Sequence, residues 1–440
     1  MADQTGAVPG LTATRIVGAR GRRVRVALLT LAAAAGGGVF LLIDGSSTPA
    51  VSAIPAMPVP ARHLETKGDG PEALLVRTMR EINANRLDVA LAEVDKMIDA
   101  YPNFRLAHLI KGDILLSRAR PLTTLGDVIG APSDEIQDLR DEARARIARQ
   151  EQQRPAGRVP RYLVQLTNAQ RHAVVVDTSK STLYVFENDD GKLRYLSDYY
   201  VSIGKNGIDK FREGDNKTPL GVYHVTKWLS PAQLASKYGK ASGLYGAGAL
   251  PLDYPNTWDQ REGRNGHGIW LHGVPFDTYS RPPRASNGCV ALTNEDLLAL
   301  TKDVRIGLTP VVIAKGVDWV TPEANALVRA EINRQLSSWK KDWESLDTEK
   351  YLHHYAADFS SGKGGLKQWS AHKRRVNAHK KWIKLKLENV SIVLYPGRDD
   401  LAVVTFDQDY SSSNYKKQMR KQQYWIRKGK GWRILQEGAA

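Results

Sequence analysis

The spacing of apolar side chains changes several times along the chain. Residues 26–43, VALLTLAAAAGGGVFLLI, form an uninterrupted uncharged run. Residues 72–150 then place apolar side chains three and four positions apart, as on one face of a helix. From residue 162 the apolar positions are β-branched and aromatic and are bounded by turn formers, which is typical of strands. The pattern predicts several separately folded parts in a chain of 440 residues.

The amino-terminal run predicts a membrane segment. Its 18 residues are just long enough to span a bilayer. Five arginines precede it, at positions 15, 20, 22, 23 and 25, which orients residues 1–25 to the cytoplasm as a basic segment. Residues 26–43 are therefore a transmembrane anchor, or a cleaved signal because Val51-Ser52-Ala53 offers a cut site. Both alternatives place the rest outside the cytoplasm, expected to be periplasmic and held to the inner membrane, or secreted after cleavage.

A linker and a helical region follow the membrane segment. Residues 44–71 are rich in Pro, Ala and Ser and predict an extended tether. Within residues 72–150, Ala90, Tyr101, Pro102 and Ala107 resemble positions of a tetratricopeptide-type (TPR-like) helix pair. Only one repeat is visible, and a solenoid needs about three for independent stability. The region is therefore expected to be a TPR-like helical spacer.

Two further domains are predicted after the spacer. Residues 162–316 contain AVVVDTSKSTLYVF, LRYLSDYYVSIG, PLGVYHVTKW and TPVVIAK, which predict a mostly-β domain. Residues 321–440 begin with a helical pattern that runs to Asp358 and continue with four long strand patterns. This α+β architecture resembles the NTF2-like fold. The expected fold is thus multidomain: membrane anchor, helical spacer, mostly-β domain and NTF2-like domain.

The charge of the chain adds an expectation about partners. The net charge is +16, and residues 361–440 hold 18 Lys and Arg against 6 Asp and Glu. Basic surfaces favour polyanions such as nucleic acid, acidic lipid or cell wall. Aromatic residues lie among basic ones in QYWIRKGKGW, but the outward topology argues against nucleic acid. The carboxy-terminal domain either holds the protein to acidic peptidoglycan, forms a dimer, binds another partner, or is a plain soluble domain with a charged face.

Cys289 is the only cysteine of the chain. In an oxidising compartment cysteines usually pair, and a single one has no internal partner. It is either a small buried apolar residue or a reactive thiol. A cysteine nucleophile needs a base, hydrogen-bond donors for the oxyanion, and access. His272 lies 17 positions earlier. Asn287, Gly288 and Cys289 form a tight turn in which the glycine is expected to let backbone amides face the substrate.

These residues carry a family resemblance. HG at 272–273, SNGC at 286–289 and EGDNKTPLGVYHV from Glu213 resemble the YkuD-type L,D-transpeptidases, over residues 170–316. The resemblance implies Cys289 as the nucleophile and His272 as its base. It implies that the carbonyl of Gly273 orients the imidazole, and that Ser286, Asn287 and Gly288 shape the oxyanion turn.

The chain also departs from the family pattern. Asn287 stands where many members have histidine, and Ala291 where members often have Arg or Asn. Arg281 and Arg284 are candidate replacements, because guanidinium pairs well with the carboxylates of a stem peptide. His267 lies five positions before His272, but no second cysteine or HExxH pattern supports a metal. Neither a metal nor a cofactor is expected.

The resemblance implies acyl transfer on peptidoglycan. Cys289 would attack the carbonyl of the third residue of a tetrapeptide stem and release D-alanine. The acyl group would pass to an amine of another stem, of a wall-attached protein or of a free D-amino acid. Water as acceptor would make the protein an L,D-peptidase, and a non-catalytic wall-binding scaffold is the remaining alternative.

Overall fold

The structure is a computed structural model that describes residues 70–127, 130–151, 154–362, 364–429 and 431–440. The expected basic segment, the anchor at 26–43 and nearly all of the linker lie outside these residues. Among the helices that the structure describes, none is both long and apolar enough to cross a bilayer.

Four helices form a unit that we call the helical module. They are α1 (Pro71–Asn83), α2 (Leu87–Ala100), α3 (Arg105–Leu116) and α4 (Ser133–Glu151). Proline at the start of α1 and the acidic Glu72 beside it suit a helix amino terminus. The predicted helix pair corresponds to α2 and α3, whose Ala90 and Ala107 are completely buried. The likeness to a tetratricopeptide repeat stays a prediction.

The central domain contains a five-stranded sheet with the strand order β5-β4-β3-β12-β7. The strands are β3 (His172–Asp177), β4 (Thr182–Asp189), β5 (Lys192–Tyr200), β7 (Gly221–His224) and β12 (Pro310–Ala314). Strand β3 pairs in parallel with β12, and both read as continuous apolar runs because side chains on both faces are buried. The four segments predicted as strands in this region do contain strands.

Smaller sheets of the central domain carry the residues around the cysteine. One has the order β11-β9-β8 and the other pairs β10 with β6. Their bounds are β6 (Ile203–Gly204), β8 (Ala249–Pro251), β9 (Trp270–His272), β10 (Arg284–Ser286) and β11 (Val290–Ala291). The helices of this domain are α5 (Pro231–Tyr238), η1 (Gly239–Tyr245), α6 (Thr257–Arg261) and α7 (Asn294–Thr301).

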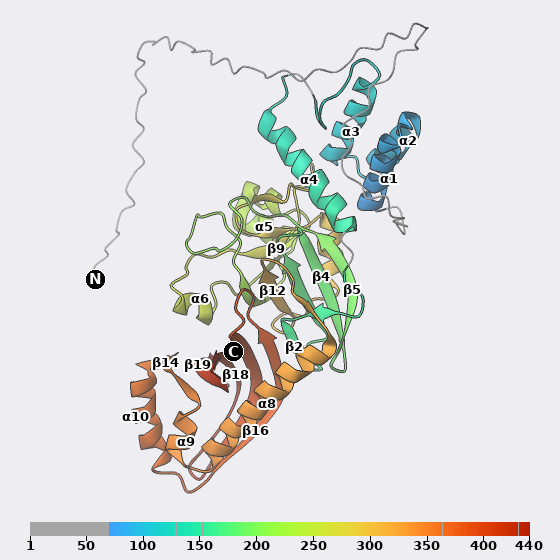
Figure 1. Ribbon diagram of the computed structural model, residues 1–440. Coiled ribbons are helices and arrows are strands. Elements are labelled where there is room, and N and C mark those ends of the chain that lie inside the picture. Colours follow the sequence, from blue (N-terminus) through green and yellow to red (C-terminus); the bar gives the residue numbers. More distant parts are fainter. Residues whose placement is uncertain (1–69, 128–129, 152–153, 363, 430) are drawn as a thin grey trace, which may run out of the picture. The chain divides into compact units, whose positions relative to one another are not determined.

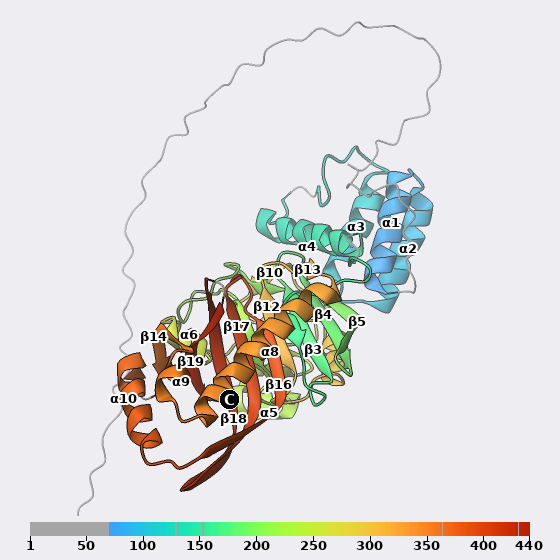
Figure 2. The same cartoon turned by 60° about the horizontal axis from the view of Figure 1, so that its bottom comes forward.

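The carboxy-terminal domain packs helices on a curved sheet. The helices are α8 (Pro322–Glu344), α9 (Thr348–Leu352) and α10 (Leu366–Asn377). The long helix α8 lies along the sheet in both views (Figures 1 and 2). Its strands are β14 (Tyr355–Ser361), β15 (Gly364–Gly365), β16 (Ile383–Leu394), β17 (Leu401–Ser412), β18 (Tyr415–Lys428) and β19 (Gly431–Ala439). Ile332, Leu336 and Trp339 of α8 are buried against this sheet.

Short strands join the central and carboxy-terminal domains. Strand β2 (Leu163–Gln165) pairs with β16 and so forms the edge of the carboxy-terminal sheet. Strand β1 (Val159–Pro160) pairs with β13 (Trp319–Val320). The chain therefore contributes β2 to the carboxy-terminal sheet before it enters the central sheet at β3.

Two expectations about the carboxy-terminal domain were wrong in detail. The helical pattern was expected to reach Asp358, but Tyr355–Ser361 forms β14, which pairs with β19. The residues up to Asp358 contain no helix breaker, but the pairing of β14 with the distant strand β19 outweighs their local helical pattern. Helix α10 was not expected. Its buried residues are Trp369, Lys373 and Asn377, so only one of the three is apolar.

Candidate active site

Strand pairing brings the cysteine and the histidine together. Cys289 directly precedes β11, and His272 is the last residue of β9. The two strands run in parallel, with Ala291 opposite His272. Cys289 therefore lies one diagonal step from His272 across adjacent strands. The imidazole is 3% exposed, whereas the cysteine is only partly buried.

A hydrogen bond fixes the tautomer of His272. Its Nδ1 lies 2.5 Å from the carbonyl oxygen of Gly273. A carbonyl only accepts, so Nδ1 carries the hydrogen and Nε2 keeps its lone pair. Burial lowers the pKa of His272 to about 4, against the effect of the Gly273 hydrogen bond and together with the charge of Arg281. The imidazole is therefore a neutral base at neutral pH.

The thiol is also neutral in the resting site. Cys289 Sγ donates a hydrogen bond to the carbonyl oxygen of Gly268 at 3.2 Å. Burial raises the pKa of Cys289 to about 11, while the Trp270 amide and the charges of Arg281 and Lys210 act in the opposite direction. Within the described part of the chain, no hydrogen bond joins Sγ to the imidazole directly. The site thus holds a neutral thiol and a neutral imidazole.

The turn before the cysteine is held from within by Ser286. This buried side chain donates to the Cys289 carbonyl at 2.6 Å and accepts from the Gly288 amide at 3.1 Å. The Gly288 amide is thus engaged inside the turn, so the expectation that amides of this turn face the substrate fails for this one amide and stays a prediction for the others. Gly288 itself has φ +120°, and a Cβ there would lie 2.7 Å from the carbonyl oxygen of Lys217. Asn287 is exposed.

Thr218 holds the same turn from outside. This completely buried residue donates to the Gly288 carbonyl at 2.9 Å and accepts from the Gly204 amide at 2.9 Å. The Thr-Pro-x-Gly stretch was noted for its resemblance to the family, but the sequence did not establish whether Thr218 borders the cleft. The available signal in the sequence was a threonine directly before a proline.

The two candidate substrate-binding arginines lie in different settings. Arg281 is half-buried, and its charge lowers the pKa of both His272 and Cys289. Arg284 is exposed on β10, and no contact within the described residues connects it to either group. His267 is also exposed, lies before β9, and has Nδ1 3.5 Å from Glu213.

Tyr245 is a further residue of the site that sequence reasoning missed. It lies at the end of η1, and its ring meets the His272 imidazole edge-on at 5.1 Å and the Trp270 ring at 4.8 Å. Its pKa is raised by burial and by the nearby Cys289. The surrounding segment has no regular periodicity, so nothing in its pattern marked this tyrosine.

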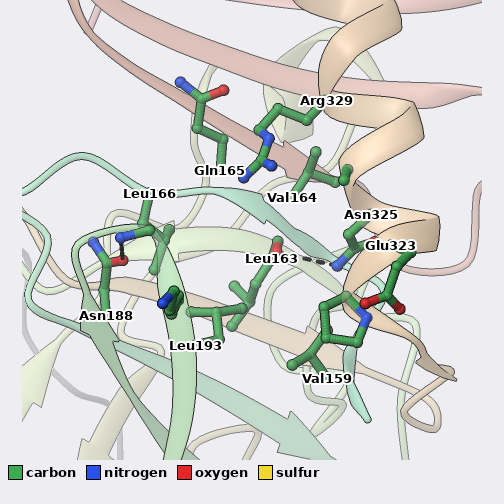
Figure 3. Close-up of a pocket in the computed structure, with 14 residues that line it drawn as sticks. Val159, Leu163, Val164, Gln165, Leu166, Asn188, Leu193, Glu323, Asn325 and Arg329 are labelled. Atoms are coloured by element: carbon green, nitrogen blue, oxygen red, sulfur yellow. Dashed lines mark hydrogen bonds between the residues drawn. The ribbon is translucent and has the colours of Figure 1, made fainter. Parts of the chain in front are cut away.

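A cavity of about 420 Å³ borders the site on the side of Arg281. Its wall combines Ser280, Arg281 and Ala285 with Arg105 and Glu142 of the helical module. A different cavity of about 500 Å³ lies beside β2 and α8 (Figure 3). There Asn325 Nδ2 donates to the Leu163 carbonyl at 3.2 Å. None of the candidate catalytic residues lines this second cavity.

Comparison with known proteins places these features in a class: an L,D-transpeptidase-type domain followed by an NTF2-like domain. The YkuD L,D-transpeptidase catalytic domain matches residues 171–313, and the Cds6 C-terminal NTF2-like domain matches residues 331–438. The chain belongs to the YkuD L,D-transpeptidase family, so the resemblance noted from the sequence is confirmed. No curated protein matches the chain.

Solved structures support this assignment. Bd1075 of Bdellovibrio bacteriovorus is 30% identical with a TM-score of 0.55, over 64% of this chain and 98% of that chain. The helical cell shape determining protein Pgp2 of Campylobacter jejuni is 26% identical with a TM-score of 0.52, over 63% of this chain and 95% of that chain. The two family matches both begin after the helical module.

Proposed function

We propose that the protein is a cysteine-dependent L,D-transpeptidase of peptidoglycan. The observation that carries this proposal is the Nδ1 hydrogen bond from His272 to Gly273, which leaves Nε2 free to take a proton from the partly exposed thiol directly before the adjacent strand. The substrate is the tetrapeptide stem on which this family acts. Cys289 attacks the carbonyl of its third residue.

The proton steps follow from the neutral resting pair. The thiol leaves the Gly268 carbonyl and gives its proton to His272 Nε2 as sulfur bonds to the carbonyl carbon. The tetrahedral intermediate then breaks its carbon–nitrogen bond. The leaving D-alanine amine takes the proton from the imidazolium, and a thioester remains. An acceptor amine attacks the thioester carbonyl and gives a proton to the imidazole. The carbon–sulfur bond then breaks, and the imidazolium returns its proton to the leaving sulfur, which restores the thiol.

Two groups are candidates to stabilise charge on the substrate. The Cys289 amide is the proposed oxyanion donor, because the Gly288 amide already binds Ser286 Oγ. Arg281 is the proposed partner of a stem carboxylate, since its charge reaches both reacting groups and it lines the adjoining cavity. Arg284 remains a weaker candidate for the same role on the exposed strand β10.

The decisive experiment incubates purified protein with tetrapeptide muropeptides and separates the products. Cross-linked dimers and free D-alanine support transpeptidation. Tripeptides without dimers would show that water is the acceptor and that the enzyme is an L,D-peptidase. Cys289→Ala and His272→Ala should abolish either product, which ties the reaction to this pair.

A non-catalytic wall-binding scaffold is the second candidate. The resting thiol favours it, because Sγ donates to Gly268 and its pKa is raised to about 11. The family resemblance implies that carbapenems acylate the cysteine, so a carbapenem tests the point directly. A mass increase equal to one carbapenem on Cys289 supports an enzyme, and an unmodified thiol in folded protein supports the scaffold.

We further propose that the carboxy-terminal domain holds the protein to the wall. A cavity of about 550 Å³ in this domain is lined by aromatic rings and by Lys373, Lys380, Lys417 and Lys421. The Lys373 ammonium lies 4.2 Å from the Trp343 ring centre and 4.4 Å from that of Trp369. Ammonium groups among aromatic rings suit an organic carboxylate. A dimer formed through this domain is the competing proposal.

The location and role of the protein are proposals as well. The arginine-rich run before residues 26–43 supports a periplasmic protein held to the inner membrane, or secreted after cleavage. Its partners would be stem peptides and a wall-attached protein. The likeness to Pgp2 supports a part in determining cell shape.

A further inference from the structure

The loop between the two reacting residues is fastened to the helical module. The Tyr279 ring packs on Tyr101 and Phe104, with ring centres 4.7 Å and 5.0 Å away. The Tyr279 amide donates to the Asn103 carbonyl at 3.2 Å. The Asn103 side chain in turn donates to the Phe276 carbonyl at 3.0 Å. Two points of this loop are thus tied to one short segment of the module.

A buried ion cluster makes the next contact. Ser280 Oγ donates to Glu142 of α4, which also accepts from Arg146 Nε at 2.9 Å. Arg146 binds Glu72 of α1 as well, and its side chain is 1% exposed. Breaking such a buried cluster is costly, so its members hold one fixed arrangement. The Arg146 guanidinium also lies 4.0 Å from the centre of the Tyr200 ring.

Tyr200 continues the connection to Arg281. Its hydroxyl donates to the Arg281 carbonyl at 3.0 Å. Tyr279 and Ser280 contact the helical module directly. The next residue, Arg281, is bound through its carbonyl by Tyr200, whose ring lies against Arg146 of the module. A displacement of the module therefore displaces the backbone that carries the Arg281 side chain.

We propose that the helical module is a support of the active site, which clamps residues 276–281 and so fixes the backbone that carries Arg281. Tyr279 is the main positioning residue. Only the expected effect on substrate binding rests on the proposed function. The placement of Arg281 is testable without any peptidoglycan substrate.

The test uses the single thiol as a probe of local charge. Cys289 is the only cysteine, so alkylation of the full chain reports on this site alone. A nearby guanidinium favours anionic iodoacetate over neutral iodoacetamide. Arg281→Ala should lower the iodoacetate to iodoacetamide rate ratio by roughly threefold to tenfold at low salt. Tyr279→Ala should lower this rate ratio nearly as much. Tyr279→Phe should leave the ratio at the wild-type value, because the ring packing is kept.

A double mutant makes the test sharp. Tyr279→Ala combined with Arg281→Ala should give the ratio of Arg281→Ala alone, because both changes remove the same charge from the thiol. Arg118→Ala is the control within the module, since Arg118 pairs with Asp88 away from the loop. It should leave the ratio unchanged. If Tyr279→Ala keeps the wild-type ratio, or if the two effects multiply, the proposal is overturned.

A substrate assay and a milder variant complete the design. With tetrapeptide muropeptides, Tyr279→Ala should raise KM several-fold with a smaller change in kcat, because a carboxylate contact is misplaced. Wild-type protein without turnover would refute the proposed function while the alkylation ratios still decide the clamp. If Tyr279→Ala does not fold, Ser280→Ala removes one hydrogen bond to Glu142 and should lower the ratio in the same direction. An unchanged ratio in folded Ser280→Ala would then count against the clamp.

Discussion

Thr218 Oγ1 donates a 2.9 Å hydrogen bond to the carbonyl oxygen of Gly288, which lies 70 positions further along the chain. The same hydroxyl accepts from the Gly204 amide. One buried side chain therefore joins two loops directly at the residue that precedes the cysteine. The Thr-Pro-x-Gly stretch and the Ser-Asn-Gly-Cys stretch are parts of a single structure.

Removing this hydroxyl should damage the site and the fold together. Thr218→Val keeps the shape but leaves the Gly204 amide and the Gly288 carbonyl buried without their partner. Each such group costs about 1–3 kcal/mol, so the free energy of unfolding should fall by roughly 2–6 kcal/mol. Carbapenem acylation of Cys289 should slow at least tenfold. Urea unfolding and intact-mass kinetics measure the two effects, and Thr218→Ser should be close to wild type in both. Unchanged acylation in Thr218→Val would refute the role of the hydroxyl.

Gly288→Ala should be more harmful than an ordinary glycine substitution. The new methyl group would lie 2.7 Å from the Lys217 carbonyl oxygen, at a φ of +120° that alanine rarely adopts. The turn must shift, so acylation of Cys289 should be lost. Gly263→Ala is the matched control, because Gly263 also has a positive φ, +73°, and its new Cβ would meet only Phe211 at 4.0 Å. That control should cost about 1 kcal/mol of stability and keep acylation. Equal acylation rates in the two variants would contradict the account.

Sequence patterns predicted where strands lie in this chain better than which strands pair with one another. The segment LAVVTFDQDYSS was expected as a strand and is β17, with the same limits. The pairing of β2 with the carboxy-terminal sheet was not expected, because a three-residue strand has no pattern of its own. Helix α10 was missed because Lys373 and Asn377 occupy its buried face.

The site was predicted unevenly for a similar reason. Cys289 and His272 stand in short motifs and could be found from the sequence. The roles of Ser286 and Thr218 depend on which carbonyl each hydroxyl reaches, and only the folded chain determines that. The clamp on Tyr279 joins residues of two different domains, so no local pattern contains it.

The lowered pKa of His272 predicts a stability loss in acid. The pKa is about 4 in the folded state against 6.5 ordinarily, so the unfolded state binds the proton more readily. Above pH 6.5 His272 costs no stability. As the pH falls from 6.5 to 4, the free energy of unfolding declines by roughly 3 kcal/mol. Urea unfolding at pH 7.5 and 4.5 measures the loss. His272→Asn, whose amide can still donate to Gly273, should lose about that much less than wild type. Equal losses in the two proteins would contradict the assigned pKa.

The same pKa predicts the pH dependence of acylation. In the proposed mechanism His272 takes the thiol proton only when it is neutral, so the acylation rate should rise with pH around 4 and be level from about pH 6 to 9. A carbapenem with a fixed charge state in this window is the suitable reagent. A rate that instead rises tenfold per pH unit up to pH 9 would mean that thiolate forms without the imidazole, and His272 would not be the base.

The aromatic cavity of the carboxy-terminal domain should contribute to wall binding through Lys373. Lys373 is 8% exposed as a residue, and its ammonium lies over the rings of Trp343 and Trp369. Lys373→Met keeps the volume and removes the charge, so sedimentation with purified sacculi should weaken several-fold and depend less on salt. Lys416→Ala is the control, because Lys416 is exposed on β18 and does not line the cavity. Its loss removes the same net charge from the domain. If both variants weaken binding equally, binding follows overall charge rather than the cavity. If neither does, the wall is held elsewhere, and analytical ultracentrifugation of the wild type then tests the competing proposal of a dimer.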